Sequence, residues 1–183
     1  MNKIIKDSIL GCILITSLYL VLFYPLILIH KFEWYDLLLV SLSISPGIFI
    51  MIFIYNLDAN NKEPLWLLAM SFILGAMNLH IDVDILEYAF TFINIENNFI
   101  RIGEEALTIA ITEELLKFFV VILILYPNKN FDEPFDGIVY SVFVGMGFAT
   151  AENLTFVLQG STTTAIFRML SAVPAHFVFA VIM

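Results

Sequence analysis

The sequence has little charge and a single cysteine. Only 14% of the 183 residues are charged, against roughly 25% in soluble domains, and 61% are hydrophobic. The mean hydropathy is +0.95. This composition excludes an ordinary soluble globular domain. The one cysteine, Cys12, lies in an apolar stretch, so no disulfide can form within the chain, and we expect Cys12 to be a small buried side chain.

Several sequence motifs of soluble enzymes are also missing. There is no His-Glu-x-x-His zinc motif, no phosphate-binding glycine loop and no Gly-x-Ser-x-Gly nucleophile elbow. The 8 basic residues are outnumbered by 17 acidic ones, and no basic stripe alternates with aromatic residues. We therefore expect no nucleic-acid partner. Any chemistry must depend on carboxylates, histidine, amides and isolated cations.

Long apolar runs predict an all-α, polytopic membrane protein. A helix needs about 20 predominantly apolar residues to cross a bilayer. Six segments approach or exceed this length: 8–29, 36–55, 64–80, 101–126, 134–158 and 162–183. We expect them to form one helical transmembrane domain over residues 1–183, with the catalytic motifs within 101–183. The link after the short third segment predicts an amphipathic interfacial helix around Ile85–Ile93.

The two ends of the sequence carry further expectations. Lys3 and Lys6 precede an apolar run without a cleavage site, which favours a retained first span over a signal peptide. The distribution of lysines in the short loops predicts a multi-pass protein of the cell membrane with a cytoplasmic N-terminus. The sequence reaches Met183 within an apolar run that no charged residue closes. We expect at least one further span in the full-length protein.

Segment 101–126 carries two adjacent carboxylates near its centre, Glu113 and Glu114. One charge at a helix centre costs about 2.5–3.5 kcal/mol on insertion scales, so these acids and Lys117 together cost about 8–10 kcal/mol if nothing offsets them. Charged groups within a span usually face a protein interior or a water-filled cavity. We therefore expect the functional site at this position.

Each of the last three segments has a helical face on which small residues lead to an ionisable one. The faces comprise Ala106, Ala110, Glu113 and Lys117; Ser141, Gly145, Ala149 and Glu152; and Thr164, Arg168, Ala172 and then Ala175 or His176. Small residues let helices approach closely. We expect these segments to pack together and to direct their ionisable side chains into a shared interior, with Asn153 beside them.

A structural interpretation of this cluster competes with the functional one. Glu113 and Lys117 can form an ion pair between successive helical turns, and Arg168 can neutralise Glu152. Pairing accounts for one acid in segment 101–126, but not for two acids together with Glu152 and His176. Pro174 also predicts a helix kink beside His176. We therefore favour a functional site.

Two acidic loops next to the predicted spans are interpreted structurally. Pro134 suits a first helical turn, where Asp136 interacts favourably with the helix dipole. The turn that contains Asp58 and Glu63 precedes Pro64, and we expect it to be solvated.

A buried glutamate of this kind can act as a general base for water. His176, Asn153 or Arg168 can then stabilise an oxyanion. Attack of water on a peptide carbonyl fits these residues. Carboxylates within a membrane also serve as proton relays in transporters, so the residues alone leave the class of protein open.

Several segments resemble successive motifs of the PrsW family of membrane-embedded proteases, relatives of the CAAX prenyl endopeptidases and of immunity-type membrane proteases. These segments are Glu113-Glu-Leu-Leu-Lys117, Phe135-Asp-Gly-Ile-Val-Tyr-Ser141, Gly147-Phe-Ala-Thr-Ala-Glu-Asn153, Arg168 and Pro174-Ala-His176, and Tyr55–Pro64 is similar to an early loop of the family. The resemblance implies a protease that cleaves a membrane-anchored regulatory protein, such as an anti-sigma factor, on its extracytoplasmic side.

By position, the resemblance implies a set of catalytic and supporting residues. The catalytic residues are Glu113, Glu114, Glu152 and His176, and the supporting residues are Lys117, Asn153 and Arg168. The family has a further span with a second histidine, so we expect the 183-residue chain to be inactive alone and the full-length protein to be active.

Two mechanisms stay open at this point. In the first, which the single intramembrane histidine favours, glutamate activates water and no cofactor is needed. In the second, Glu113, Glu152 and His176 hold a divalent metal such as zinc. Two other classes of protein are also considered: a non-enzymatic membrane sensor or immunity-type protein, and an ion-coupled transporter. The sequence does not bear on the oligomeric state.

Overall fold

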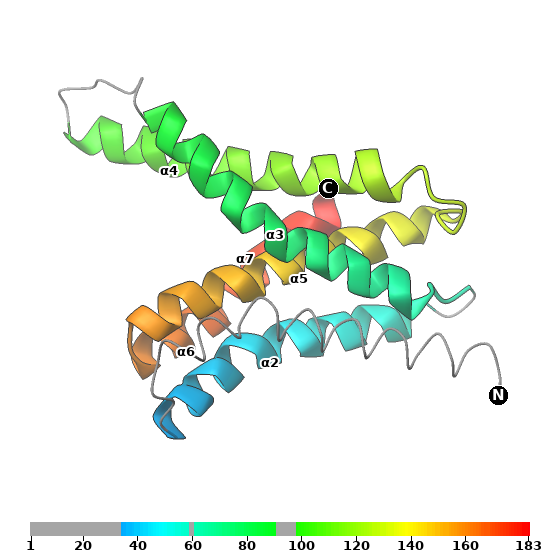
Figure 1. Cartoon of the computed structure of the whole chain (residues 1–183), viewed down its shortest axis with the longest axis horizontal. Coiled ribbons are helices and arrows are strands. Elements are labelled where there is room, and N and C mark those ends of the chain that lie inside the picture. Colours follow the sequence, from blue (N-terminus) through cyan, green and yellow to red (C-terminus); the bar gives the residue numbers. More distant parts are fainter. Residues whose placement is uncertain (1–33, 59–60, 91–97) are drawn as a thin grey trace.

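The computed structural model describes residues 34–58, 61–90 and 98–183, which contain helices and no strand (Figure 1). The helices are α2 (Trp34–Leu57), α3 (Leu65–Phe90), α4 (Asn98–Val120), the π-helical turn η1 (Val121–Leu125), α5 (Pro134–Gln159), α6 (Thr162–Leu170) and α7 (Ala172–Ile182). The all-α prediction is confirmed for this part of the chain.

Helix α5 is the centre of the bundle. It packs against α2, α3 and α7, and Figure 1 shows it between α4 and α2. Every residue from Val139 to Thr150 is buried. A helix that is buried on all sides forms the core of a bundle, so α5 sets the positions of its neighbours.

The crossing of α3 and α5 depends on two glycines. A Cβ atom on Gly147 would lie 2.0 Å from the carbonyl oxygen of Phe72, and one on Gly75 would lie 2.0 Å from that of Val144. The two backbones are therefore in direct contact, and only glycine fits at either position. Gly145 faces the other way, where its Cβ would lie 3.0 Å from the Cβ of Ala180 in α7.

The first turn of α5 is closed by a capping box. Asp136 Oδ2 accepts hydrogen bonds from the backbone N–H groups of Asp132 and Glu133, at 2.8 Å and 2.7 Å. Pro134 occupies the start of the helix, where a missing N–H group costs nothing. The structural interpretation of Asp136 is confirmed.

The predicted segment 162–183 is helical but divided at Ser171, whose φ and ψ of −120° and −62° interrupt the helix. Pro174 explains the position of this break. It has no N–H group for the carbonyl of Leu170, and its ring displaces that carbonyl. The predicted kink therefore occurs about one turn before the proline, and His176 lies on the short helix α7.

Three of the predicted spans match segments that are long and apolar enough to cross a membrane: Trp34–Leu57, Pro134–Gln159 and Thr162–Ile182. Segment 64–80 corresponds to a shorter apolar helix, Leu65–Ile81. The expected span 8–29 lies outside the described residues. The count of six spans is therefore not confirmed. The expected helix around Ile85–Ile93 is helical as far as Phe90, but as the continuation of α3, and the rest of that range lies outside the described residues.

Helix α4 is helical as predicted, although its ionisable residues exclude it from the segments that qualify as spans by composition. Its outer face is apolar and exposed, with Leu107, Ile111, Leu115 and Phe119 in succession. Its inner face carries Lys117, which is only 1% exposed. This pattern reverses that of a water-soluble helix and suits a helix between lipid and a polar interior.

Candidate active site

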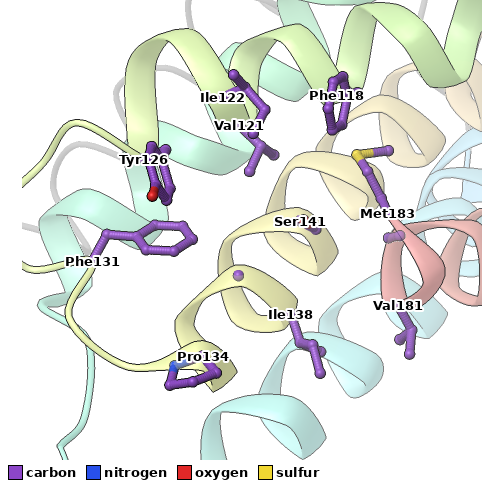
Figure 2. Close-up of a pocket in the computed structure, with 12 residues that line it drawn as sticks. Phe118, Val121, Ile122, Tyr126, Phe131, Pro134, Ile138, Ser141, Val181 and Met183 are labelled. Carbon is purple, nitrogen blue, oxygen red and sulfur yellow. The ribbon is translucent and has the colours of Figure 1, made fainter.

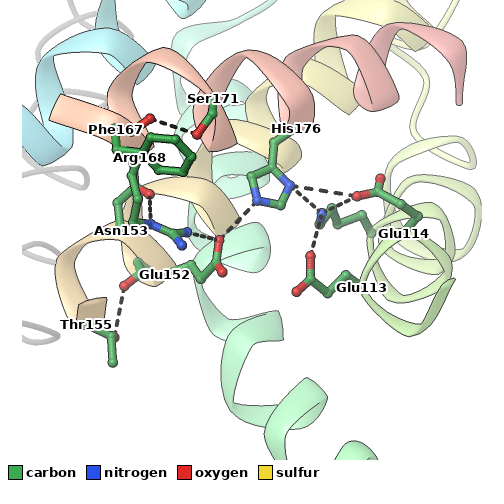
Figure 3. Close-up of polar contacts among 11 residues, drawn as sticks. Glu113, Glu114, Glu152, Asn153, Thr155, Phe167, Arg168, Ser171 and His176 are labelled. Atoms are coloured by element: carbon green, nitrogen blue, oxygen red, sulfur yellow. Dashed lines mark hydrogen bonds and ion pairs between the residues drawn. The ribbon is translucent and has the colours of Figure 1, made fainter. Parts of the chain in front are cut away.

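The structure brings together the catalytic and supporting residues that the family resemblance implies. Figure 3 shows Glu113 and Glu114 of α4 on one side of His176 of α7. Glu152 of α5 lies on the other side of His176, and Arg168 of α6 contacts Glu152. The predicted convergence of these helices is therefore observed. Which of these residues act in catalysis stays a prediction.

Lys117 lies between the two glutamates and the histidine. Its Nζ atom is 2.6 Å from Glu114 Oε1, 3.0 Å from His176 Nδ1 and 3.8 Å from Glu113 Oε2. The same atom is 4.2 Å from the centre of the Phe148 ring. The predicted ion pair with Glu113 is present, but the shorter contact is with Glu114.

His176 is held on both edges of its ring. An ammonium group can only donate, so His176 Nδ1 accepts from Lys117, and the ring proton lies on Nε2. Nε2 then donates to Glu152 Oε2 at 3.0 Å. The edge of the ring also contacts Phe148, with 5.5 Å between the ring centres. These partners fix both the tautomer and the orientation of the imidazole.

Glu152 is held in turn by Arg168. The Nη2 atom of Arg168 lies 2.6 Å from Glu152 Oε2, and its Nε donates to Asn153 Oδ1 at 2.7 Å. The expected neutralisation of Glu152 by Arg168 is therefore present. The same carboxylate also contacts His176, so this ion pair supports the histidine and is more than a local neutralisation.

Three side chains of the cluster are placed to hold a metal ion. Glu113, Glu114 and His176 each offer a donor atom, and the three atoms lie within 4.8 Å of one another. Glu114 Oε2 is buried without a hydrogen-bond partner. Carboxylate oxygen and imidazole nitrogen are typical zinc ligands, so the residues present fit a divalent metal.

This group differs from the expected metal set of Glu113, Glu152 and His176 in its second acid. The two nitrogens of an imidazole point in different directions, and Glu152 contacts Nε2. Glu114 instead lies on the side of Nδ1, with Oε1 3.7 Å from that atom. Glu114 can therefore share a metal ion with Nδ1 of His176, whereas Glu152 contacts the opposite nitrogen and orients the ring.

An apolar pocket of about 290 Å³ lies near this cluster, between η1, the first half of α5 and the end of α7 (Figure 2). Phe118, Ile138 and Val181 are among the side chains that line it. None of its lining residues is an acid, a lysine, an arginine or a histidine. The pocket therefore contains none of the charged side chains of the cluster.

The sequence interpretation missed a second group of buried acids, near the start of α5. Asp58 and Glu63 are both 3% exposed, and Asp136 is 1% exposed. Tyr140 donates a hydrogen bond to Glu63 Oε2. The expectation of a solvated turn is therefore wrong for Asp58 and Glu63, and Glu63 is tied to α5 by this hydrogen bond. Asn61 and Lys62, between them, are exposed as expected. The one signal in the sequence was that Tyr140 lies one helical turn after Asp136. The hydrogen-bond partner of Tyr140, Glu63, is 77 residues away, so spacing within the segment could not reveal it.

The ionisation of Glu63 should make stability depend on pH. Burial away from water raises the pKa of Glu63 from 4.5 to about 7, and nearby Asp136 and Asp58 add to this rise, whereas the Tyr140 hydrogen bond lowers it. The folded state then binds the proton more tightly than the unfolded state. The stabilisation that protonated Glu63 provides is complete below pH 4.5. It is lost as the pH rises to about 7, and the free energy of unfolding then falls by on the order of 3 kcal/mol.

Thermal unfolding of the purified protein between pH 4.5 and 8 checks this expectation. Glu63→Gln, which cannot ionise, should remove part of the loss of Tm above pH 5, whereas the exposed Glu104→Gln should leave the wild-type profile unchanged. Identical pH profiles for the wild type and Glu63→Gln would refute the role assigned to Glu63.

Half-buried carboxylates around a buried imidazole, in a bundle of apolar helices, are typical of a membrane-embedded site for hydrolytic or proton-transfer chemistry. Comparison with known proteins narrows this class. The sequence profile of the PrsW family, described as an intramembrane metalloprotease family, matches residues 63–183. The chain therefore belongs to the PrsW family.

Several curated relatives carry the name Protease PrsW. The chain is 37% identical over 145 residues to the protein of Geobacillus kaustophilus, covering 79% of this chain and 63% of the relative. It is 32% identical over 145 residues to the protein of Bacillus subtilis, with 79% and 65% covered. It is 34% identical over 147 residues to that of Clostridioides difficile, with 78% and 61% covered. The match thus spans less than two thirds of each relative. No solved structure matches the chain.

Proposed function

We propose that the full-length protein is an intramembrane endopeptidase, and that the cluster of Glu113, Glu114, Glu152 and His176 is its active site. The observation that carries this proposal is the group of buried His176 and half-buried Glu113 and Glu114, whose donor atoms converge within 4.8 Å. Family membership supports the same reaction class, because the relatives are named proteases. The proposed substrate is a membrane-anchored protein, such as an anti-sigma factor.

The family description favours the metal-dependent mechanism over the metal-free one. Glu113, Glu114 and His176 would hold a divalent ion such as zinc, and three protein ligands are typical of a catalytic zinc site. When bound, such an ion polarises a carbonyl oxygen and makes water more acidic. A second histidine, which the family resemblance implies, would complete or replace one of these ligands.

The residues of this chain divide into those that act on substrate and those that position them. Glu114 would face the ion through Oε1, the oxygen on the side of His176 Nδ1. Its other oxygen, Oε2, is buried and makes no hydrogen bond, so we assign the role of general base to Oε2. Glu152 orients His176 through Nε2, and Arg168 holds Glu152 in place. Asn153 accepts from Arg168 and extends this support.

The proposal predicts that cleavage depends on metal. The full-length protein is reconstituted in liposomes with a membrane-anchored reporter protein, and the cleavage products are measured before and after treatment with a zinc chelator. We expect the chelator to reduce the rate by at least about 100-fold and added zinc to restore it. The 183-residue chain, expected to be inactive alone, is assayed in parallel.

The possible results separate the two parts of the proposal. Cleavage that persists at the full rate in excess chelator would refute the metal and restore the metal-free mechanism. A full-length protein that binds the reporter but never cleaves it would refute the protease and support a non-enzymatic sensor. Proton-coupled substrate flux without cleavage would support a transporter.

A further inference from the structure

Within the proposed active site, we infer that Lys117 is a built-in competitor of the metal ion. Its ammonium group occupies the space between Glu113, Glu114 and His176, so the lysine must leave this position before the three donors can bind an ion. This inference rests on the proposed metal-dependent function and adds a residue that controls loading of the site.

The contacts of Lys117 Nζ are with the three proposed metal ligands. It lies 2.6 Å from Glu114 Oε1, 3.0 Å from His176 Nδ1 and 3.8 Å from Glu113 Oε2. Zinc binds oxygen and nitrogen at about 2.0–2.2 Å. An ion shared by donors that converge within 4.8 Å must therefore lie between them, close to the position of Nζ. Two cations cannot share that space, because both steric overlap and charge repulsion oppose it.

The sequence keeps Lys117 within reach of this position. It follows Glu114 by three residues and Glu113 by four, the spacings at which side chains meet on one helical face. The side chain is 1% exposed, so its charge is compensated by the cluster and not by water. Before metal binds, Lys117 thus offsets the charge of the adjacent acids and holds the donors together.

The structure also gives the ammonium an aromatic partner outside the set of proposed ligands. Nζ already lies 4.2 Å from the centre of the Phe148 ring, a distance typical of a cation–π contact. The flexible four-carbon stem of lysine allows a shift toward this ring while α4 stays in place. The exchange involves no covalent step. One cation replaces another, and the lysine keeps an aromatic partner.

Metal affinity tests this inference without an activity assay. Zinc binding by the full-length protein is measured by competition with a chromogenic chelator for the wild type, Lys117→Met and Lys117→Gln. Both variants remove the competing charge, so each should bind zinc at least about 10-fold more tightly. Zinc should also raise the Tm of each variant more than that of the wild type. Lys117→Arg, which keeps the charge, should not bind more tightly.

Lys62→Met is the matched control. Lys62 also donates a hydrogen bond and lies 4.1 Å from an aromatic ring centre, that of Tyr55, but it is outside the cluster. Its removal should leave zinc affinity unchanged. Zinc binding by Lys117→Met and Lys117→Gln that is equal to or weaker than that of the wild type would overturn the inference. If these variants unfold, failure of zinc to restore their folding would overturn it as well. Either result would leave the proposed protease intact. If neither the wild type nor any variant bound zinc, both the inference and the metal-dependent mechanism would be refuted. The cleavage assay with the chelator tests the proposed protease activity separately.

Discussion

Replacement of Glu113 or Glu114 by glutamine in the full-length protein will reduce the cleavage rate of a membrane-anchored substrate by at least about 100-fold. Both carboxylates lie within the donor group that converges on His176. Glutamine keeps the shape of the side chain but cannot accept a proton from water and is a poor zinc ligand. The loss should appear mainly in kcat, measured with the reconstituted reporter, because the role that we propose for these groups is in the chemical step.

Glu104→Gln provides the control for this pair. Glu104 lies on the same helix but is exposed and distant from the cluster along the chain. Its replacement should change the rate less than about twofold, and all three variants should be inserted in the membrane equally well. Full activity of both Glu113→Gln and Glu114→Gln would rule out the assigned active site.

Substitution of Gly147 by alanine will destabilise the protein severely, by about 3 kcal/mol or more. The added methyl group would lie 2.0 Å from the carbonyl oxygen of Phe72, which belongs to the backbone of α3 and cannot rotate away. The two helices must therefore separate along their crossing. Thermal unfolding of the purified protein should show a large loss of Tm, or no folded protein at all.

Gly103→Ala is the matched comparison for this substitution. Gly103 is also in a helix, but a Cβ atom there would have no neighbour within 4 Å. Alanine should be neutral or stabilising by up to about 1 kcal/mol, because it is the better helix former. If the two substitutions had equal effects, the close contact of α3 and α5 at Gly147 would be refuted.

The part of the site that could be predicted follows from local spacing. Glu113 and Lys117 share a face because they are four residues apart, and Pro174 interrupts its helix because it lacks an N–H group. The cost of a charge within a span also predicted that Glu113 and Glu114 of α4 face inward. Each of these arguments needs only the residue types and their separation in one segment.

The remaining features depend on contacts between distant segments, which spacing within one helix does not specify. Nothing in the run around Gly75 indicates that it crosses α5 at Gly147, because many small residues in membrane helices could make such a contact. Glu63 was expected in a solvated turn because its partner, Tyr140, is 77 residues away. The choice of Glu114 over Glu152 in the metal group depends on which edge of the His176 ring each acid meets.

The central claim is that side chains of α4 and α7 act as one catalytic unit. It is tested most directly by a double-mutant cycle on the cleavage rate, with the full-length wild type, Glu114→Gln, His176→Ala and the double variant in liposomes. We predict that each single variant loses nearly all activity and that the double variant is no slower than the slower single one. Losses that multiply in the double variant, or wild-type activity of His176→Ala, would contradict the account.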